Sequence, residues 1–81
     1  MYYFQMKKEE KQLLLNNLAI SIKKRRLQLN ISQEKLAEKC GFDRTYISML
    51  ERAKRNPSFI NLVKISKGLE IEINDLLSLE N

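Results

Sequence analysis

The chain has 81 residues, 43% of them hydrophobic, which suits one small domain with a single core. Its apolar runs reach only three or four residues, far short of the roughly 20 that cross a bilayer, and charges at positions 7 to 11 interrupt any secretory leader. One cysteine, Cys40, and no histidine exclude an internal disulfide and a zinc site. We therefore expect a soluble, cytoplasmic protein without a metal.

The net charge of +5 is unevenly distributed along the chain. Residues 1–58 hold 13 Lys and Arg against 6 Asp and Glu, whereas residues 59–81 hold 2 against 4. A basic surface attracts polyanions, since each phosphate contact releases condensed counterions. Charge alone leaves two interpretations equally open, a nucleic-acid-binding surface or a solubilising one.

The first predicted helix runs from about residue 7 to residue 29. Four aliphatic residues recur at spacings of three, four and seven and share one side of it: Leu15, Leu18, Ile22 and Leu29. Asn30 ends the pattern, because asparagine tolerates the left-handed conformation that closes a helix. The sequence leaves open whether residues 1–6 are disordered or lie on the core.

Two short helices follow, Gln33 to Cys40 and Arg44 to about Arg52. The hydroxyl of Ser32 can accept a hydrogen bond from an unpaired amide of the first turn, and Asp43 can cap the second helix in the same way. Gly41 permits a sharp turn between the two helices. This arrangement is typical of a helix-turn-helix unit.

The predicted packing of the two short helices agrees with that motif. Ala37 allows a close approach, while Phe42, Ile47 and Leu50 bury the joint against Leu36. Counted from Gln33, the small residue, the turn glycine and the β-branched residue occupy the fifth, ninth and fifteenth places, as the packing of the motif requires.

The rest of the chain predicts a loop and two further helices. Pro57 cannot donate a helical hydrogen bond, so residues 53–57 form a loop and a fourth helix runs from Ser58 to about Gly68. Its apolar side consists of Phe59, Leu62, Val63 and Ile65. Residues 69–73 alternate apolar and acidic side chains, as a strand would, but with no partner strand we expect an extended connection. Asn74 then caps a last helix over residues 75–79, which gives an all-α, five-helix fold.

Several segments of the chain match one known pattern: Ile22, Arg26, the run ISQEKLAEKCG that ends at Gly41, the run YISMLE that begins at Tyr46, and the Asn-Pro-Ser boundary at residues 56–58. Through them the chain resembles the phage-repressor or Cro-type helix-turn-helix regulators over about residues 18–79. The run DRTYISMLERAKRNPS over residues 43–58 is similar in particular to the controller proteins of restriction-modification systems, which are homodimeric and bind palindromic operators.

The resemblance implies a compact lambda-repressor-like domain and a transcription regulator, either repressor or activator, bound to double-stranded DNA. We expect no cofactor, and the sequence shows no evident pocket for a small-molecule ligand. Residues 1–81 would form one DNA-binding domain, with residues 1–16 as an N-terminal extension and residues 69–81 as a dimerisation tail.

The base-reading residues are expected at the start of the second short helix, which would enter the major groove. Arg44 can donate two hydrogen bonds to guanine O6 and N7, Thr45 can meet a thymine methyl group, and Met49 can make an apolar contact. The alternatives are that Arg44 is an ordinary surface residue and that Met49 fills a gap in the core.

Contacts with phosphate are expected on both sides of that helix, because positioning contacts outnumber base contacts. Gln33 lies at a helix N-terminus, where free amides favour an anion. Tyr46 can bond a phosphate through its hydroxyl or read the shape of the backbone with its ring. The other expected phosphate contacts are Ser48, Arg52, Arg55 and Asn56, and Lys54 is a further candidate.

Other residues have structural roles in the resemblance. Arg26 and Glu51 would form a partly buried ion pair between the first and third helices. Arg25 departs from the pattern, since many relatives carry Leu or Ile there. For the dimer interface we expect Ile73, Asp75 and Leu79, whereas Leu76 is expected to close the core.

The sequence also bears on two other functions. The sequence contains no carboxylate pair with a plausible pocket and no phosphate-cradling glycine loop, so we do not expect an enzyme. An antitoxin-like module with secondary DNA binding is the alternative, because Leu13, Leu14 and Leu15 could dock a partner helix.

Overall fold

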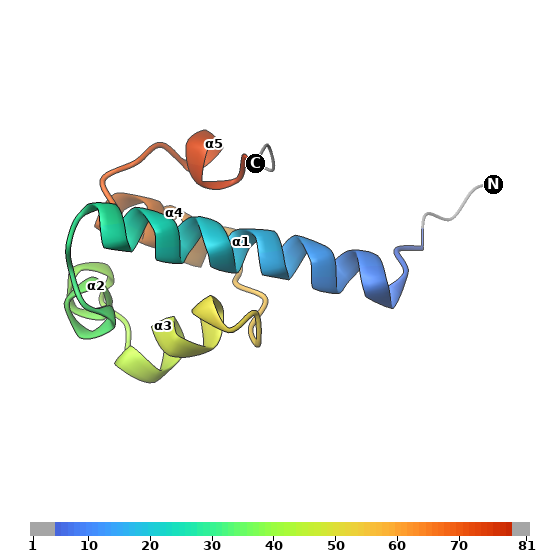
Figure 1. The fold of residues 1–81 in the computed structure, drawn as a ribbon, viewed down its shortest axis with the longest axis horizontal. Coiled ribbons are helices and arrows are strands. Elements are labelled where there is room, and N and C mark those ends of the chain that lie inside the picture. Colours follow the sequence, from blue (N-terminus) through green and yellow to red (C-terminus); the bar gives the residue numbers. More distant parts are fainter. Residues whose placement is uncertain (1–4, 79–81) are drawn as a thin grey trace.

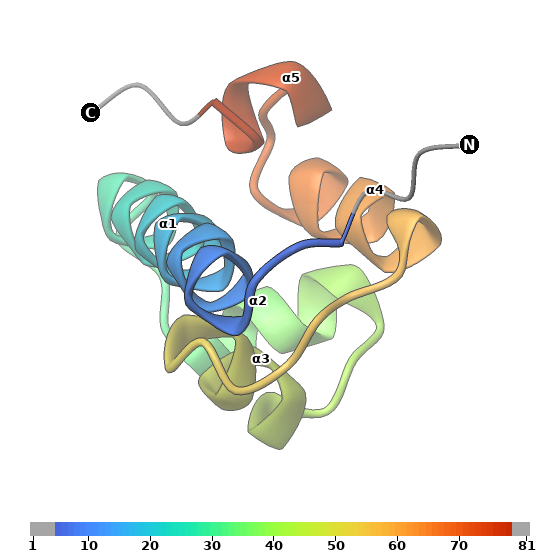
Figure 2. The ribbon, with the colours of Figure 1, turned by 90° about the vertical axis from the view of Figure 1, so that its right-hand side faces the viewer.

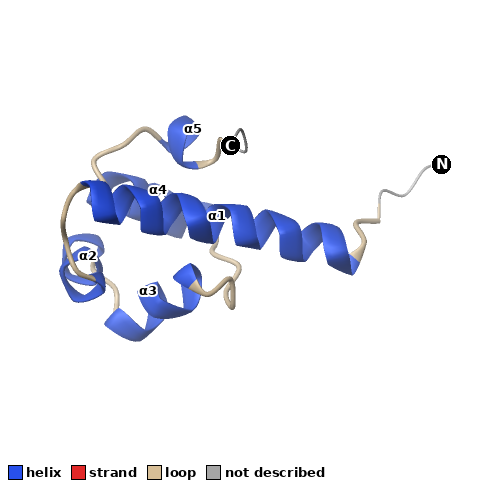
Figure 3. Cartoon of the chain, in the orientation of Figure 1, coloured by secondary structure: helices blue, strands red, loops and turns tan. Residues whose placement is uncertain are grey.

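The computed structural model describes residues 5–78, and its regular structure there consists of α-helices (Figure 3). These helices are α1 (Lys8–Gln28), α2 (Gln33–Cys40), α3 (Arg44–Glu51), α4 (Phe59–Gly68) and α5 (Ile73–Leu76). The predicted all-α, five-helix class is confirmed. None of these described helices combines the length and apolarity that crossing a bilayer requires.

The long helix α1 organises the molecule. α3 and α5 lie on opposite edges of the structure, and α1 contacts both of them (Figures 1 and 2). α2 packs against α3 and α4. The N-terminal half of α1 extends beyond the other helices (Figure 1).

Every helix contributes at least one buried side chain to the core. The largest fully buried side chains are Ile22, Leu36, Ile47, Leu50, Ile65, Leu69 and Leu76. Burying each such side chain contributes about 1.5 to 3 kcal/mol, so this cluster is the main source of stability.

Helices α1 to α4 all end in the same way, with one residue in the left-handed conformation. These residues are Asn30 (φ 58°), Gly41 (φ 76°), Ala53 (φ 58°) and Glu70 (φ 55°). After each of them, the next amide donates to the carbonyl five residues earlier, as Phe42 N does to Ala37 O at 2.9 Å. This is the bond that closes a Schellman motif. The sequence predicted the left-handed residues Asn30 and Gly41, and missed Ala53 and Glu70.

Two predictions about the second half of the chain are wrong. The last helix is Ile73–Leu76 rather than residues 75–79, because Glu72 takes the extended N-cap conformation and Asn74 lies inside the helix. Phe59 is 65% exposed, because it is the first residue of α4 and points away from the side that buries Ile65.

The contact between α2 and α4 depends on a small residue. A Cβ atom at Gly68 would fall against Cys40 Sγ, closer than real Cβ contacts occur. Cys40 is buried there, and burial raises the pKa of its thiol above the ordinary value. The thiol therefore stays protonated at neutral pH and serves as packing.

Candidate nucleic-acid interface

The two helices of the helix-turn-helix unit, α2 and α3, are capped differently. Ser32 is the N-cap of α2, and its hydroxyl accepts a hydrogen bond from Lys35 N at 3.0 Å. Gly41 closes α2 in the left-handed conformation. Asp43 occupies the N-cap position of α3, but its side chain makes no capping hydrogen bond.

α3 presents a mainly polar side to solvent because its buried apolar residues lie together on the side that faces the core. Ile47 and Leu50 are buried, whereas Arg44 and Thr45 at the N-terminus of the helix are exposed. At 100° per residue, four side chains fall on the side opposite Ile47 and Leu50, namely Thr45, Ser48, Met49 and Arg52, while Arg44 lies at the flank of that side. Ser48 and Met49 are half-buried at the margin.

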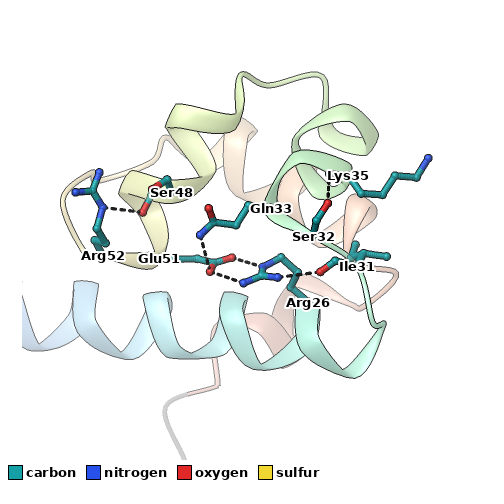
Figure 4. Close-up of polar contacts among 8 residues, drawn as sticks. All are labelled: Arg26, Ile31, Ser32, Gln33, Lys35, Ser48, Glu51 and Arg52. Carbon is teal, nitrogen blue, oxygen red and sulfur yellow. Dashed lines mark hydrogen bonds and ion pairs between the residues drawn. The ribbon is translucent and has the colours of Figure 1, made fainter.

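A buried ion pair joins α1 to α3 (Figure 4). Arg26 donates to both carboxylate oxygens of Glu51, through Nε at 2.7 Å and Nη2 at 2.9 Å. Its third donor, Nη1, reaches Ile31 O at 2.8 Å. The hydrogen bond to Glu51 raises the pKa of the Arg26 guanidinium above its ordinary value.

Gln33 extends this pair to α2. Its Nε2 donates to Glu51 Oε1 at 3.1 Å, so a single carboxylate connects α1, α2 and α3 (Figure 4). This bond was not predicted from the sequence. It leaves one amide hydrogen and the amide oxygen of Gln33 for other partners. The network therefore fixes the start of α2 relative to the end of α3.

Tyr46 is held from two sides. Its ring packs on Phe42 with 4.8 Å between centroids, and the guanidinium carbon of Arg55 lies 5.1 Å from its centroid. Its hydroxyl accepts a hydrogen bond from Asn61 Nδ2 at 3.0 Å. The sequence leaves two roles open for Tyr46, a phosphate contact through its hydroxyl or shape reading by its ring. In the structure the hydroxyl keeps its own hydrogen to donate, and the ring is already stacked.

The segment after α3 gathers exposed polar residues. Arg52 turns back along the helix, with Nε donating to Ser48 O at 3.3 Å. Lys54, Arg55 and Asn56 follow and are exposed. Asn56 also borders an apolar groove formed by α1 and α5.

Arg25 has a polar role rather than the packing role of an aliphatic residue. Its Nε donates to Leu69 O at 2.9 Å and its Nη2 to Glu70 O at 3.1 Å. These carbonyls lie at the C-terminus of α4, where a positive charge is favourable. Arg25 thus joins α1 to the connection between α4 and α5.

Some charged side chains of the described residues form ion pairs and others do not. They form three ion pairs: Arg26–Glu51, Lys35–Glu38 at 3.4 Å and Lys39–Glu70 at 2.6 Å. The hydrogen bond from Lys39 lowers the pKa of Glu70. Arg44, Arg52 and Arg55 take part in none of these pairs. The cations on and after α3 are therefore available to an external anion.

The residues expected at the dimer interface are only partly accessible. Ile73 is half-buried and Asp75 is exposed, while Leu79 lies outside the described residues. Leu76 is buried in the core, as expected.

Comparison with known proteins agrees with this geometry. Residues 22–76 match the helix-turn-helix family. The control protein C.BamHI of Bacillus amyloliquefaciens is 56% identical over 48 residues, which are 59% of this chain and 59% of that protein. The control protein C.MunI of a Mycoplasma species is 46% identical over 56 residues, 69% of this chain and 76% of that protein.

One similar solved structure contains DNA. It is the restriction-modification controller protein C.Esp1396I, as a tetramer in complex with its natural 35 base-pair operator. The TM-score is 0.70 at 41% identity, over 80% of this chain and 96% of that one.

The chain therefore belongs to the helix-turn-helix family of transcription regulators, which are not enzymes. Within that family it is similar to the control proteins of restriction-modification systems, as its sequence predicted.

Proposed function

We propose that the protein is a cytoplasmic, sequence-specific transcription regulator that binds a palindromic operator as a homodimer, of the type that controls restriction-modification genes. The supporting observation is the outward side of α3, with Arg44 exposed at its N-terminus and paired with none of the described carboxylates. The similarity to a controller protein whose structure contains its operator adds to this support.

In this proposal the N-terminus of α3 reads bases. Arg44 donates to a guanine, Thr45 contacts a thymine methyl group or a base acceptor, and Met49 makes an apolar contact one turn further on. The Arg26–Glu51–Gln33 network holds α3 at a constant angle to α1. The three base-contacting side chains therefore enter the groove without reordering the helix.

Phosphates are held around that helix. Arg52 and Arg55 supply charge, and the stacking of Arg55 on the Tyr46 ring restricts its guanidinium before DNA arrives. Gln33 offers its second amide hydrogen at the N-terminus of α2, and the Tyr46 hydroxyl offers its hydrogen. Ser48 and Asn56 add neutral contacts.

The domain organisation is part of the proposal. Residues 1–81 act as one DNA-binding domain, extended by residues 1–16 at the N-terminus and by a dimerisation tail over residues 69–81. A homodimer presents two α3 helices to half-sites about 34 Å apart, which gives a small domain the affinity that one helix lacks.

The test compares the effects of substituting two arginines on binding to the DNA that flanks the gene of this protein. Footprinting locates the site, and gel shift then measures each variant on the site and on single-base mutants. Arg44→Ala should weaken binding about 5- to 150-fold and lose preference at one base pair, the effect of about 1–3 kcal/mol. Arg55→Ala should weaken all sequences alike and reduce the magnitude of the salt slope by about one per subunit, which is about two per dimer.

Two outcomes would contradict the proposal. Equal loss of base preference in both variants would remove the division of roles between base and phosphate contacts. A protein that forms no site-specific complex but co-purifies with a stoichiometric protein partner would favour the antitoxin-like alternative.

A further inference from the structure

A side-chain hydrogen bond joins α4 directly to α3. Asn61, in the first turn of α4, donates through Nδ2 to the hydroxyl oxygen of Tyr46 at 3.0 Å. Both residues are half-buried. The main packing between these two helices is indirect, because α2 lies against each of them. The sequence predicted no role for Asn61, so this bond identifies a residue that the candidate interface does not yet include.

The start of α4 holds Asn61 in place. Ser58 is the N-cap of the helix, and its hydroxyl accepts a hydrogen bond from Asn61 N at 3.2 Å. The side-chain amide therefore projects from a fixed backbone. An amide nitrogen can only donate, so the Tyr46 oxygen is the acceptor in this bond. The hydroxyl hydrogen of Tyr46 must then point away from Asn61.

The surroundings of this hydroxyl are positive. The guanidinium carbon of Arg55 lies 5.1 Å from the centroid of the Tyr46 ring, and that ring packs on Phe42. Lys64, one turn after Asn61 on α4, has its Nζ 5.7 Å from the centroid of the Phe42 ring. Over residues 5–78, neither cation is in an ion pair, and the hydroxyl donates to no protein acceptor. A positive surface of this kind favours an anionic acceptor for the hydroxyl hydrogen.

We propose that Asn61 is a positioning residue for DNA binding: its amide occupies the Tyr46 oxygen, so that the hydroxyl hydrogen is directed to a phosphate of the duplex. This inference rests on the proposed function and extends the interface to α4. A phenolic hydrogen prefers the plane of the ring, which leaves it two orientations, and Asn61 removes one of them. Because this choice is made before DNA arrives, the contact with phosphate costs less ordering on binding. A neutral contact of this type positions α3 on the duplex without reading a base.

The experiment is a double-mutant cycle measured by gel shift with the purified full chain, on the operator and on its single-base mutants. Asn61→Leu keeps the approximate size of the side chain and removes the donor. It should weaken binding about 2- to 12-fold per subunit, the range for one net hydrogen bond. The loss should be the same on every sequence, and the salt slope should not change, because the lost group carries no charge. In a Tyr46→Phe background, Asn61→Leu should cause no further loss, because the hydroxyl that it orients is absent.

Ser66→Ala is the matched control on the same helix. Ser66 is 4% exposed, and its Oγ donates to Val63 O at 2.8 Å, so this change also removes one side-chain hydrogen bond from α4. It should leave the affinity for DNA unchanged, because Ser66 does not touch Tyr46. Circular dichroism should show that all of the variants fold.

The outcomes separate this inference from the proposed function. An Asn61→Leu protein that binds like the wild type, or whose loss persists in the Tyr46→Phe background, would overturn the positioning role. An equal loss in Ser66→Ala would also overturn it, since the effect would then come from the stability of α4. A wild-type chain that binds all duplexes alike would remove the regulator function. The same cycle on a random duplex would then still decide the role of Asn61, because every sequence contains phosphates.

Discussion

The side chains of Arg26 and Glu51 are 10% and 3% exposed, and Arg26 donates one hydrogen bond to each carboxylate oxygen of Glu51. A buried charge is tolerated only when it is paired, so neither residue is replaceable alone. The prediction of this ion pair depended on the family resemblance, because no local pattern relates two residues 25 positions apart. The bond from Gln33 could not be predicted at all, since it requires three helices to be in place.

Removal of one partner should therefore cost far more than removal of a surface charge. Glu51→Gln should lower the free energy of unfolding by about 3 kcal/mol, because the Arg26 guanidinium is left buried without a counter-charge. Glu38→Gln, in the exposed pair with Lys35, should change it by less than about 1 kcal/mol. Urea unfolding followed by circular dichroism measures both, and equal losses would contradict the structural importance of the buried pair.

At the scale of the elements, the helix ends show what sequence can and cannot predict. Asn30 and Gly41 were predicted to be left-handed because those residue types favour the conformation. Ala53 and Glu70 adopt it against their type, and tertiary contacts explain this for Glu70, whose carbonyl is bound by Arg25 and whose side chain is bound by Lys39. The start of α5 was misplaced for a similar reason. Burial of Leu76 fixes this four-residue helix more than any capping residue does.

The contact between α2 and α4 gives a prediction that one double-mutant cycle can test. Gly68→Ala should cost about 1–3 kcal/mol, because its new methyl group collides with Cys40 Sγ. In a Cys40→Ala background the same change should be nearly neutral, since the sulfur is absent and alanine favours helix.

Gly41→Ala is the control for that cycle. It should cost about 1–2 kcal/mol in both backgrounds, because no atom lies near its new Cβ and the cost is that of the left-handed backbone. Thermal or urea unfolding gives the free energies of the four proteins of the cycle and of the two Gly41→Ala controls. A Gly68→Ala cost that does not depend on residue 40 would show that the collision is not the cause.

Across the whole molecule, charge is separated in space as well as along the chain. α3 and its following loop carry cations at one edge, while the acidic connection and α5 lie at the other (Figure 1). The sequence predicted the basic part and the helix-turn-helix unit, because both are local properties. It did not predict the groove, since Leu14 and Leu77 meet only after the chain has folded.

This separation predicts a steep dependence of DNA binding on salt. If Arg52, Lys54 and Arg55 each neutralise one phosphate in both subunits, the logarithm of the association constant should fall with that of salt concentration with a slope of about −5. Filter binding between about 50 and 200 mM salt measures the slope. Arg52→Gln should reduce its magnitude by about two per dimer, whereas Lys67→Gln, near the acidic edge, should not change it.

Arg25 has a consequence for the distance that a dimer can measure along DNA. By donating to the carbonyls of Leu69 and Glu70, it ties α1 to the connection before α5, the end of the chain that we propose meets a second copy. These two hydrogen bonds hold that end of the chain in one position relative to α1. The spacing between the two half-sites should therefore be fixed, so the dimer should tolerate base changes in the spacer more readily than the insertion of one base pair.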